Sequence, residues 1–202
     1  MFDYEKFKSD IAAAMEKSLR KWAEENDDIY IISLDLSRDM TSVGVWANTL
    51  YFLNKQCAAV DHLKTRIIDW ANTMNYLDEQ DYDALEDYWY FKYCEQEWEL
   101  CEAFEDISSY MRAFTEENGE QFGRNYTYTE IFDEHCDKMA ESCKKALEVF
   151  KGSVNKDFPE LLITFNINEY LDDDERVKVF SLVNSKKAAE EYMKHIADFN
   201  QS

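Results

Sequence analysis

Apolar residues recur at every third or fourth position over three stretches of the chain, which is the spacing of one face of an α-helix. Over residues 2–25 the apolar positions are Phe7, Ile11, Met15, Leu19 and Trp22. From about residue 50 to 75 they are Leu50, Leu53, Cys57, Val60, Leu63, Ile67 and Trp70. Over 128–151 they are Phe132, Cys136, Met139, Cys143, Leu147 and Phe150. We therefore expect three amphipathic helices, the second capped by Asn48 or Thr49 and the third ended by Gly152.

Three shorter segments alternate in polarity and are rich in β-branched residues, a pattern typical of strands. Residues 29–36 and 41–47 flank the turn 37–40, which predicts a hairpin. In residues 161–167 the alternate positions Leu161, Ile163, Phe165 and Ile167 are apolar. The even positions of 29–36 are all apolar, whereas the odd ones become polar at Ser33 and Asp35. One face of the first strand is therefore expected to be buried throughout, and the other only in part.

The remaining segments predict their structure less directly. The aromatic run 88–93 indicates a third strand, and 94–98 indicates the start of a helix that would reach Asn118 and stop at Gly119. The acids 172–175 suit the first turn of a helix that reaches Val183, although 177–181 also alternate as a strand would. Ser185 is expected to cap a last helix with these residues inward: Ala189, Tyr192, Met193 and Ile196.

Strands and helices are mixed without regular βαβ alternation, which favours the α+β class. We expect a single α+β domain over residues 1–202, in which several helices pack on a small, mostly antiparallel sheet.

Composition narrows the class of protein further. Of 202 residues, 46% are hydrophobic, only one is proline and four are glycine, which excludes a largely disordered chain. No run of about 18 apolar residues is present, and the first residues do not resemble a secretory signal. The five cysteines lack the spacing of a disulfide framework, so we expect reduced thiols. The expectation is a cytoplasmic protein that does not bind membranes.

Charge changes the expected partner. The chain has 43 acidic and 22 basic residues, for a net charge of −21. Such a chain repels phosphate backbones, so we expect no nucleic-acid partner and favour a basic protein partner. The alternative is that the acids serve solubility alone.

The acids and aromatic residues are concentrated together in residues 70–106, which hold twelve acids, one base and ten aromatic residues. Tyrosine and tryptophan are common at binding hot spots, and dense carboxylates steer basic partners. The expected partner-binding residues are Asp78, Glu79, Asp81, Tyr82, Asp83, Glu86, Asp87 and Tyr88. The alternative is that the aromatic residues form core and the acids are its solvated faces.

Motifs for catalysis, metal binding or cofactor binding are not evident, and we expect no catalytic residue, no metal site and no cofactor. His135 and Cys136 are adjacent, so on a helix they point about 100° apart and cannot form a dyad with each other. Cys94 and Cys101 are seven residues apart, as are Cys136 and Cys143, which predicts one helix face for each pair. Their apolar neighbours indicate buried thiols rather than zinc ligands.

Four segments together resemble the bacterial domain-of-unknown-function family 4303. They are Trp46–Thr49, Phe91–Trp98, Leu162–Tyr170 and Phe180–Asn184, in the order that the family has them. The chain has Cys94-Glu95 where the family often has Ser-Pro, and Asn168-Glu169 where an aspartate is common. The resemblance implies a small, acidic protein similar to the immunity proteins of bacterial toxin systems.

These observations favour a non-enzymatic, acidic protein-binding domain, with an immunity-type inhibitor of a basic bacterial toxin as its most specific form. The first alternative is a housekeeping α+β domain that binds a small molecule or a regulatory partner. The second is an enzyme that uses buried carboxylates, which the sequence favours least.

Overall fold

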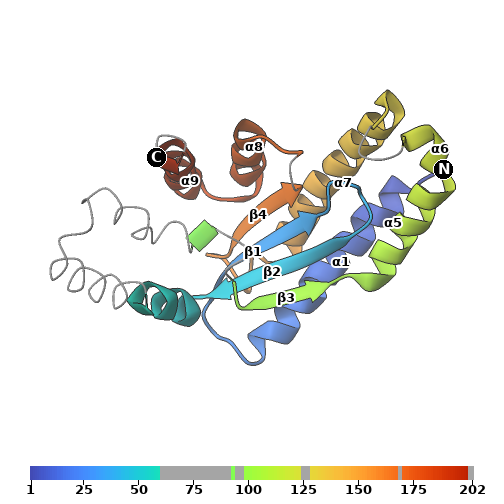
Figure 1. The fold of residues 1–202 in the computed structure, drawn as a ribbon. Helices are drawn as coiled ribbons and strands as arrows, with labels where there is room; N and C mark the ends of the chain where they lie inside the picture. The colour runs from blue at the N-terminus through green and yellow to red at the C-terminus, as the bar shows by residue number, and fades with distance from the viewer. Residues whose placement is uncertain (60–91, 94–97, 124–127, 168–169, 200–202) are drawn as a thin grey trace, which may run out of the picture.

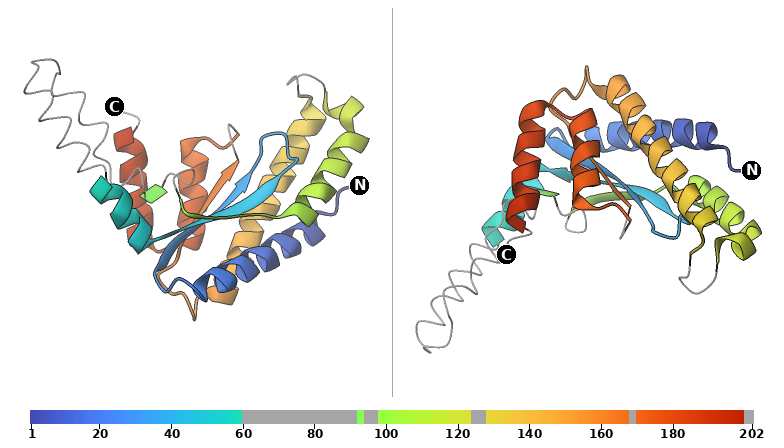
Figure 2. Two further views of the ribbon diagram at one scale, coloured as in Figure 1. Left: turned by 60° about the horizontal axis from the view of Figure 1, so that its bottom comes forward. Right: turned by 90° about the horizontal axis from the view of Figure 1, so that it is seen from above.

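A computed structural model describes residues 1–59, 92–93, 98–123, 128–167 and 170–199 of the chain (Figure 1). In these residues a four-stranded sheet lies between two unequal groups of helices (Figure 2). The first group, α1, α5 and α7, covers one face of the sheet along its length. The second group, α8 and α9, lies on the β4 side of the sheet, where α8 packs against both β4 and α7.

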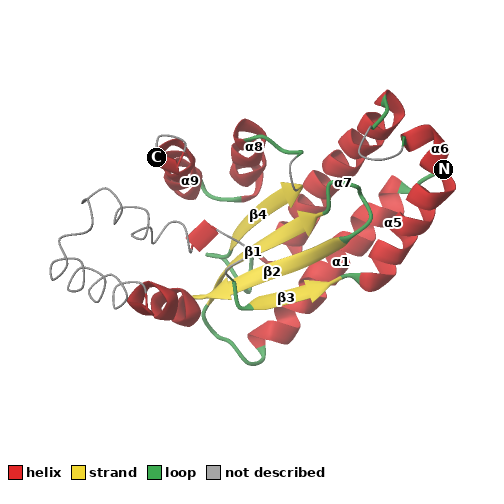
Figure 3. Ribbon diagram, in the orientation of Figure 1, coloured by secondary structure: helices red, strands yellow, loops and turns green. Residues whose placement is uncertain are grey.

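The sheet has the strand order β3–β2–β1–β4, as Figure 3 shows in yellow. Its strands are β1 (Ile29–Leu36), β2 (Val43–Thr49), β3 (Leu100–Ala103) and β4 (Leu162–Ile167). β1 pairs antiparallel with β2 and parallel with β4, and β2 pairs antiparallel with β3. The sheet is therefore mixed, and two of its three described pairings are antiparallel.

The main core lies between the sheet and the first helix group. Its helices are α1 (Tyr4–Ala23), α5 (Glu105–Glu117), α6 (Gly119–Phe122) and α7 (Glu130–Val154). The apolar stripes of α1 and α7 meet the alternate residues of three strands: Ile32, Leu34, Leu36, Val43, Val45, Ala47, Ile163, Phe165 and Ile167. All of these strand residues are buried, so the period-two pattern of each strand directs one complete face into this core.

A smaller core on the opposite face packs against α8 (Asp173–Val183) and α9 (Lys186–Phe199), while Val179 and Val183 of α8 belong to the main core. It joins Ile31 of β1 to Phe180 of α8 and Tyr192 of α9, whose two rings stack with centroids 4.3 Å apart. Asn184 follows α8 and hydrogen-bonds the edge of β4: Ile163 N–H donates to its Oδ1 at 2.8 Å, and its Nδ2 donates to the Ile163 carbonyl at 2.6 Å. A side chain thus occupies part of the outer edge of the sheet.

Most of the elements predicted from periodicity are confirmed. The helix over 2–25 is α1, and all five of its predicted inward residues are buried. The strand pair 29–36 and 41–47 is an antiparallel hairpin, and the strand at 161–167 is β4. Residues 173–183 are helical, which decides the alternative left open between helix and strand. The α+β class is confirmed.

The region around residues 92–119 is where the predictions were wrong. Lys92 and Tyr93 are helical rather than extended, and residues 88–91 and 94–97 lie outside the described residues. Residues 100–103 form β3, and the helix begins only at Glu105. Pairing with β2 outweighs the local helical pattern here, because Cys101 lies opposite Trp46 and Leu100 opposite Ala47. Cys101 is consequently on an exposed strand and not on a helix face.

Several predicted boundaries and orientations also differ. Gly152 lies inside α7, which continues to Val154. The end predicted near Asn118 is confirmed, because α5 ends at Glu117 with Asn118 as its C-cap, and Gly119 then begins the short α6. The helix after β2 is described over 50–59 only. There Leu53 is buried, but Leu50 is 44% exposed because it lies at the helix start beyond the core. Met193 of α9, predicted inward, is 43% exposed.

Candidate functional site

All eight residues predicted to bind a partner lie in 60–91, outside the described residues. They are Asp78, Glu79, Asp81, Tyr82, Asp83, Glu86, Asp87 and Tyr88. Their role therefore stays a prediction.

The face of the sheet opposite the main core is only partly covered, and its open part combines polar and apolar side chains. Strand register sets two rows of side chains across the four strands on this face. One row runs Cys101–Trp46–Ser33–Thr164, and the next runs Ala103–Gly44–Asp35–Asn166. The residues of each row come from segments far apart in the sequence, and the sheet alone brings them together.

The first row is closed at its β4 end. Ser33 and Thr164 are both buried, and the Thr164 hydroxyl donates to the Ser33 Oγ at 2.8 Å. A hydroxyl pair of this kind satisfies two buried polar groups on adjacent strands. The first row is therefore buried where it crosses β1 and β4.

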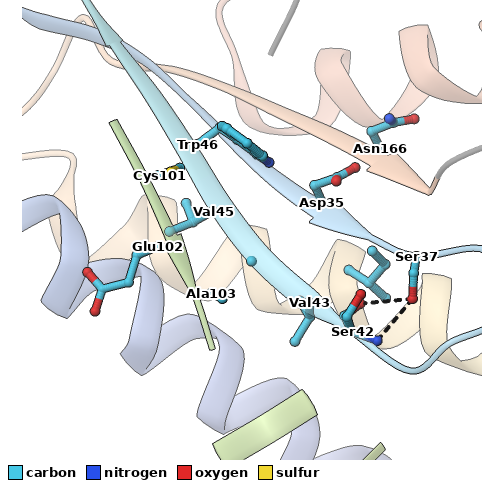
Figure 4. A pocket seen from close by; sticks show the side chains of 12 residues that line it. Asp35, Ser37, Ser42, Val43, Val45, Trp46, Cys101, Glu102, Ala103 and Asn166 are labelled. Carbon is cyan, nitrogen blue, oxygen red and sulfur yellow. Dashed lines mark hydrogen bonds between the residues drawn. The ribbon is translucent and has the colours of Figure 1, made fainter. Parts of the chain in front are cut away.

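The second row lies in the open. Asp35 and Asn166 are half-buried, and Figure 4 shows their side chains on the same side of the sheet as Trp46. These three residues and neighbours from 36–37, 42–45 and 101–103 line a hollow of 510 Å³, which we call the open-face hollow. Cys101 and Ala103, at the β3 end, are exposed. The hollow therefore combines one indole, one carboxylate and one amide within reach of solvent.

Gly44 forms the floor of the open-face hollow between Asp35 and Ala103. A Cβ atom at this position would lie 3.0 Å from the Glu102 carbonyl oxygen and 3.5 Å from the Ala103 Cα. Only glycine lets β3 approach β2 this closely without displacement. Because Gly44 has no side chain, this position of the second row also leaves space beside the Asp35 side chain.

The hairpin turn after β1 forms the rim of the hollow, and its hydrogen bonds hold it rigid. The Asp39 carboxylate accepts from the hydroxyls of Ser37 and Thr41, each at 2.7 Å. Burial raises the pKa of Asp39, but these hydrogen bonds outweigh it and lower the pKa overall. Met40 has a left-handed φ of 54° and is fully buried beneath the turn. Asp39 thus orders the turn.

The adjacent His135 and Cys136 are not arranged for nucleophilic catalysis. His135 is 4% exposed, surrounded by the rings of Phe2, Phe114 and Phe122, and its Nδ1 is 2.8 Å from the Tyr4 hydroxyl. Burial lowers the pKa of His135 to about 4 and raises that of Cys136 to about 12. Both shifts disfavour the imidazolium and the thiolate, the charged forms that a dyad needs.

The described cysteines differ in their burial. Cys143 is buried in the main core, as its apolar neighbours predicted, and Cys57, Cys101, Cys136 and Cys143 are free thiols. Within the described ranges, no three His, Cys, Asp or Glu side chains are grouped closely enough to hold a metal ion. In the same residues, no helix has both the length and the apolar character to cross a bilayer.

The sequence contains one signal for the open-face hollow, an alternation of polar and apolar residues that two distant segments share. Ser33-Leu34-Asp35-Leu36 and Thr164-Phe165-Asn166-Ile167 have the same polar–apolar alternation. Two strands that share this pattern are candidates for neighbours with a common polar face. The parallel pairing of β1 with β4 places these residues opposite each other in register.

Comparison of the chain with protein-family models, with curated proteins and with solved structures finds no match. The resemblance to family 4303 therefore stays a prediction.

Proposed function

We propose that this chain is a non-enzymatic protein-binding domain that takes up a basic protein partner, as an immunity-type inhibitor does when it covers a basic toxin domain. One observation carries the proposal: the Asp35 carboxylate and the Trp46 indole lie on the same face of the sheet and both line the open-face hollow.

The chemistry of the open-face hollow suits a lysine or arginine side chain from a partner. The indole of Trp46 offers a flat surface for the aliphatic stem and attracts a cation to its face. The Asp35 carboxylate, on the adjacent row, can pair with the charged end, and Asn166 opposite it adds an amide. Asp35 is the acid on this face, because Glu102, the other acid of the lining, pairs with Lys21 of α1 at 3.2 Å. No described lining residue is a base.

The charge of the whole chain adds to this local preference. A net charge of −21 creates a field that draws a cationic protein toward the surface before contact. Such steering raises the association rate and excludes acidic competitors. The residues predicted to bind a partner, 78–88, belong to the densest acidic part of the sequence and would contribute to the same field.

The environment of His135 and Cys136 supports a binding role rather than catalysis. Burial shifts their pKa values in the directions that make both side chains unreactive, and both belong to the core. The residues of the open-face hollow that we single out are suited to recognition, because a carboxylate, an amide and an indole can orient a partner without forming bonds to it.

The test is to immobilise the protein and capture partners from a lysate of the organism that carries the gene. We expect a captured protein that is basic and whose affinity falls at least tenfold in Asp35→Lys, because the reversal places like charges in contact. The isosteric Asp35→Asn variant removes the charge with little effect on packing, and it should weaken binding in the same direction. The matched control is Glu117→Lys, an exposed residue in the last turn of α5, where a positive charge suits the helix dipole.

Two results would overturn the proposal. One is a captured partner that is acidic. The other is a basic partner whose affinity is the same for the wild type, Asp35→Asn and Asp35→Lys, with all three shown to be folded by circular dichroism.

A further inference from the structure

A second hollow lies at the opposite end of the strands from the open-face hollow. It has a volume of 330 Å³ and is formed where β1 and β4 begin, beside the start of α9. We call it the lysine hollow, because its lining includes Lys92, Lys151 and Lys187, together with Ser185, Glu160 and Glu191.

The three lysines come from separate segments of the chain. Lys92 is in the short helical segment 92–93, Lys151 is near the end of α7, and Lys187 is in the first turn of α9. In a chain with 43 acids and 22 bases, the gathering of three ammonium groups in one cavity runs against the general charge. The lining carries three positive and two negative side chains, so the cavity is locally cationic.

Two of these ammonium groups are partly withdrawn from solvent. The Lys92 side chain is 11% exposed, with the Glu191 carboxylate 3.9 Å from its Nζ. The Lys151 Nζ donates to the Leu161 carbonyl at 3.0 Å. Burial lowers the pKa of both lysines, while Glu191 raises that of Lys92 and Glu160 raises that of Lys151. An anion in the cavity would act in the same direction as these carboxylates and would stabilise the charged forms.

The start of α9 adds donors to the same place. The Ser185 Oγ accepts from the Ala188 N–H at 3.2 Å, which fixes the first turn of this 14-residue helix against the cavity. The first N–H groups of a helix have no acceptor within the helix, and they carry part of its positive dipole. Helix starts with nearby lysines are common binding places for oxyanions.

We propose that the lysine hollow binds a small oxyanion ligand, one that carries a phosphate or a carboxylate group, through Lys92, Lys187 and the start of α9. The proposal does not depend on a basic protein partner, because it concerns the opposite end of the sheet. Lys151 holds the Leu161 carbonyl and lines the cavity, so its part is to add positive charge to the wall.

The experiment is a titration of the ¹⁵N-labelled full chain with inorganic phosphate, and separately with acetate, at constant ionic strength maintained with sodium chloride. We expect saturable shifts in the amide signals of residues 185–188 and 161–162. Saturation by phosphate alone identifies a phosphate ligand, and saturation by acetate identifies a carboxylate ligand. No saturable shift at these amides with either anion would overturn the proposal.

Substitutions then test the residues. Lys187 is exposed, so the Lys187→Met variant should fold. It should weaken anion binding about tenfold, because one charge-assisted contact is lost. Lys92→Met should weaken binding at least as much, and its methionine keeps the buried stem. The matched control is Lys186→Met, in the same helical turn, whose side chain is 92% exposed and pairs with Glu190 outside the cavity lining. Equal affinity in Lys187→Met and Lys186→Met would also contradict the assignment.

Discussion

Gly44 lies in strand β2 and Gly152 in helix α7, and the two differ in the space available for a side chain beside the Cα atom. A Cβ at Gly44 meets the β3 backbone at 3.0 Å, whereas a Cβ at Gly152 meets nothing within 4 Å. We expect Gly44→Ala to lower the free energy of unfolding by about 1–3 kcal/mol, the usual cost of overpacking against backbone.

The control for that substitution is Gly152→Ala. It should raise the free energy of unfolding by roughly 0.5–1 kcal/mol, because alanine is the better helix former and no neighbour has to move. Urea unfolding of both variants beside the wild type measures the two effects. A Gly44→Ala variant that is as stable as the wild type, or stabilised like Gly152→Ala, would show that β3 does not approach β2 as closely as described.

His135 makes the stability of the fold depend on pH. Its pKa in the folded protein is about 4, below the ordinary value of 6.5 that an unfolded chain has. Between those values the unfolded state binds a proton that the folded state does not, so stability falls as the pH is lowered from about 6.5 toward 4. The loss from this group at pH 5 is at most about 2 kcal/mol relative to pH 7.

The variant that checks this is His135→Phe, which keeps an aromatic ring among Phe2, Phe114 and Phe122 but cannot bind a proton. Urea unfolding at pH 7 and pH 5 should show a smaller decrease for the variant than for the wild type. The same pH dependence in both proteins would mean that His135 is not the group responsible. The substitution also tests the expectation from sequence that this histidine is structural.

At the scale of single residues, the sequence predicted burial better than it predicted polar neighbours. Phe7, Ile11 and Met15 are inward because helical spacing alone decides their face. Asp35 and Asn166 become neighbours only through the parallel pairing of β1 with β4, which joins residues more than a hundred positions apart. The alternation shared by the two segments marks each as a strand with a polar face, but it does not establish that the two strands pair, so the open-face hollow was not predicted.

At the scale of elements, α8 depends on a cap that the acids at 172–175 had indicated. The Asp172 Oδ1 accepts from the Glu175 N–H at 2.8 Å. We expect Asp172→Ala to lower the free energy of unfolding by about 1 kcal/mol, because the N–H loses its acceptor at the helix start. The matched control is Asp174→Ala, which removes an exposed charge from the same turn and should cost only about 0.3 kcal/mol. Thermal unfolding of the two variants gives the comparison, and equal costs would assign the effect to charge and not to the cap.

The elements that were mistaken from sequence share a physical cause. β3 has only four residues, and two of them, Glu102 and Ala103, are not strand formers. Its conformation comes from pairing with β2 and from the absence of a side chain at Gly44, both of which are tertiary effects. The long helix α7 was predicted because 25 residues of periodic pattern outweigh one glycine, although the boundary at Gly152 was placed too early.

At the scale of the whole molecule, the net charge follows directly from the sequence, and its field acts on a partner before contact. We call residues 70–106, which hold twelve acids, the acidic segment. Reversal of Asp78, Glu79, Asp81 and Asp83 to lysine changes the sign of its densest part, in a polar stretch of sequence where the fold should tolerate the change. We expect the rate of association with a captured basic partner to fall about tenfold or more at low salt. Raising the ionic strength should slow the wild type toward the variant, because exposed charges are screened within about 8 Å at physiological salt.

The matched control carries the same change of charge in another place. Glu24, Glu25, Glu116 and Glu117 are exposed and lie at or just after the last turns of α1 and α5, where lysine is favourable. If residues 78–83 form part of the docking surface, their reversal slows association more than the control reversal does, because steering depends on where the partner first makes contact. Equal slowing in both variants, measured by stopped-flow or surface plasmon resonance over a range of salt, would leave only the net charge at work. That result would reduce the acidic segment to a solvated face, and the open-face hollow at Asp35 would have to account for recognition by itself.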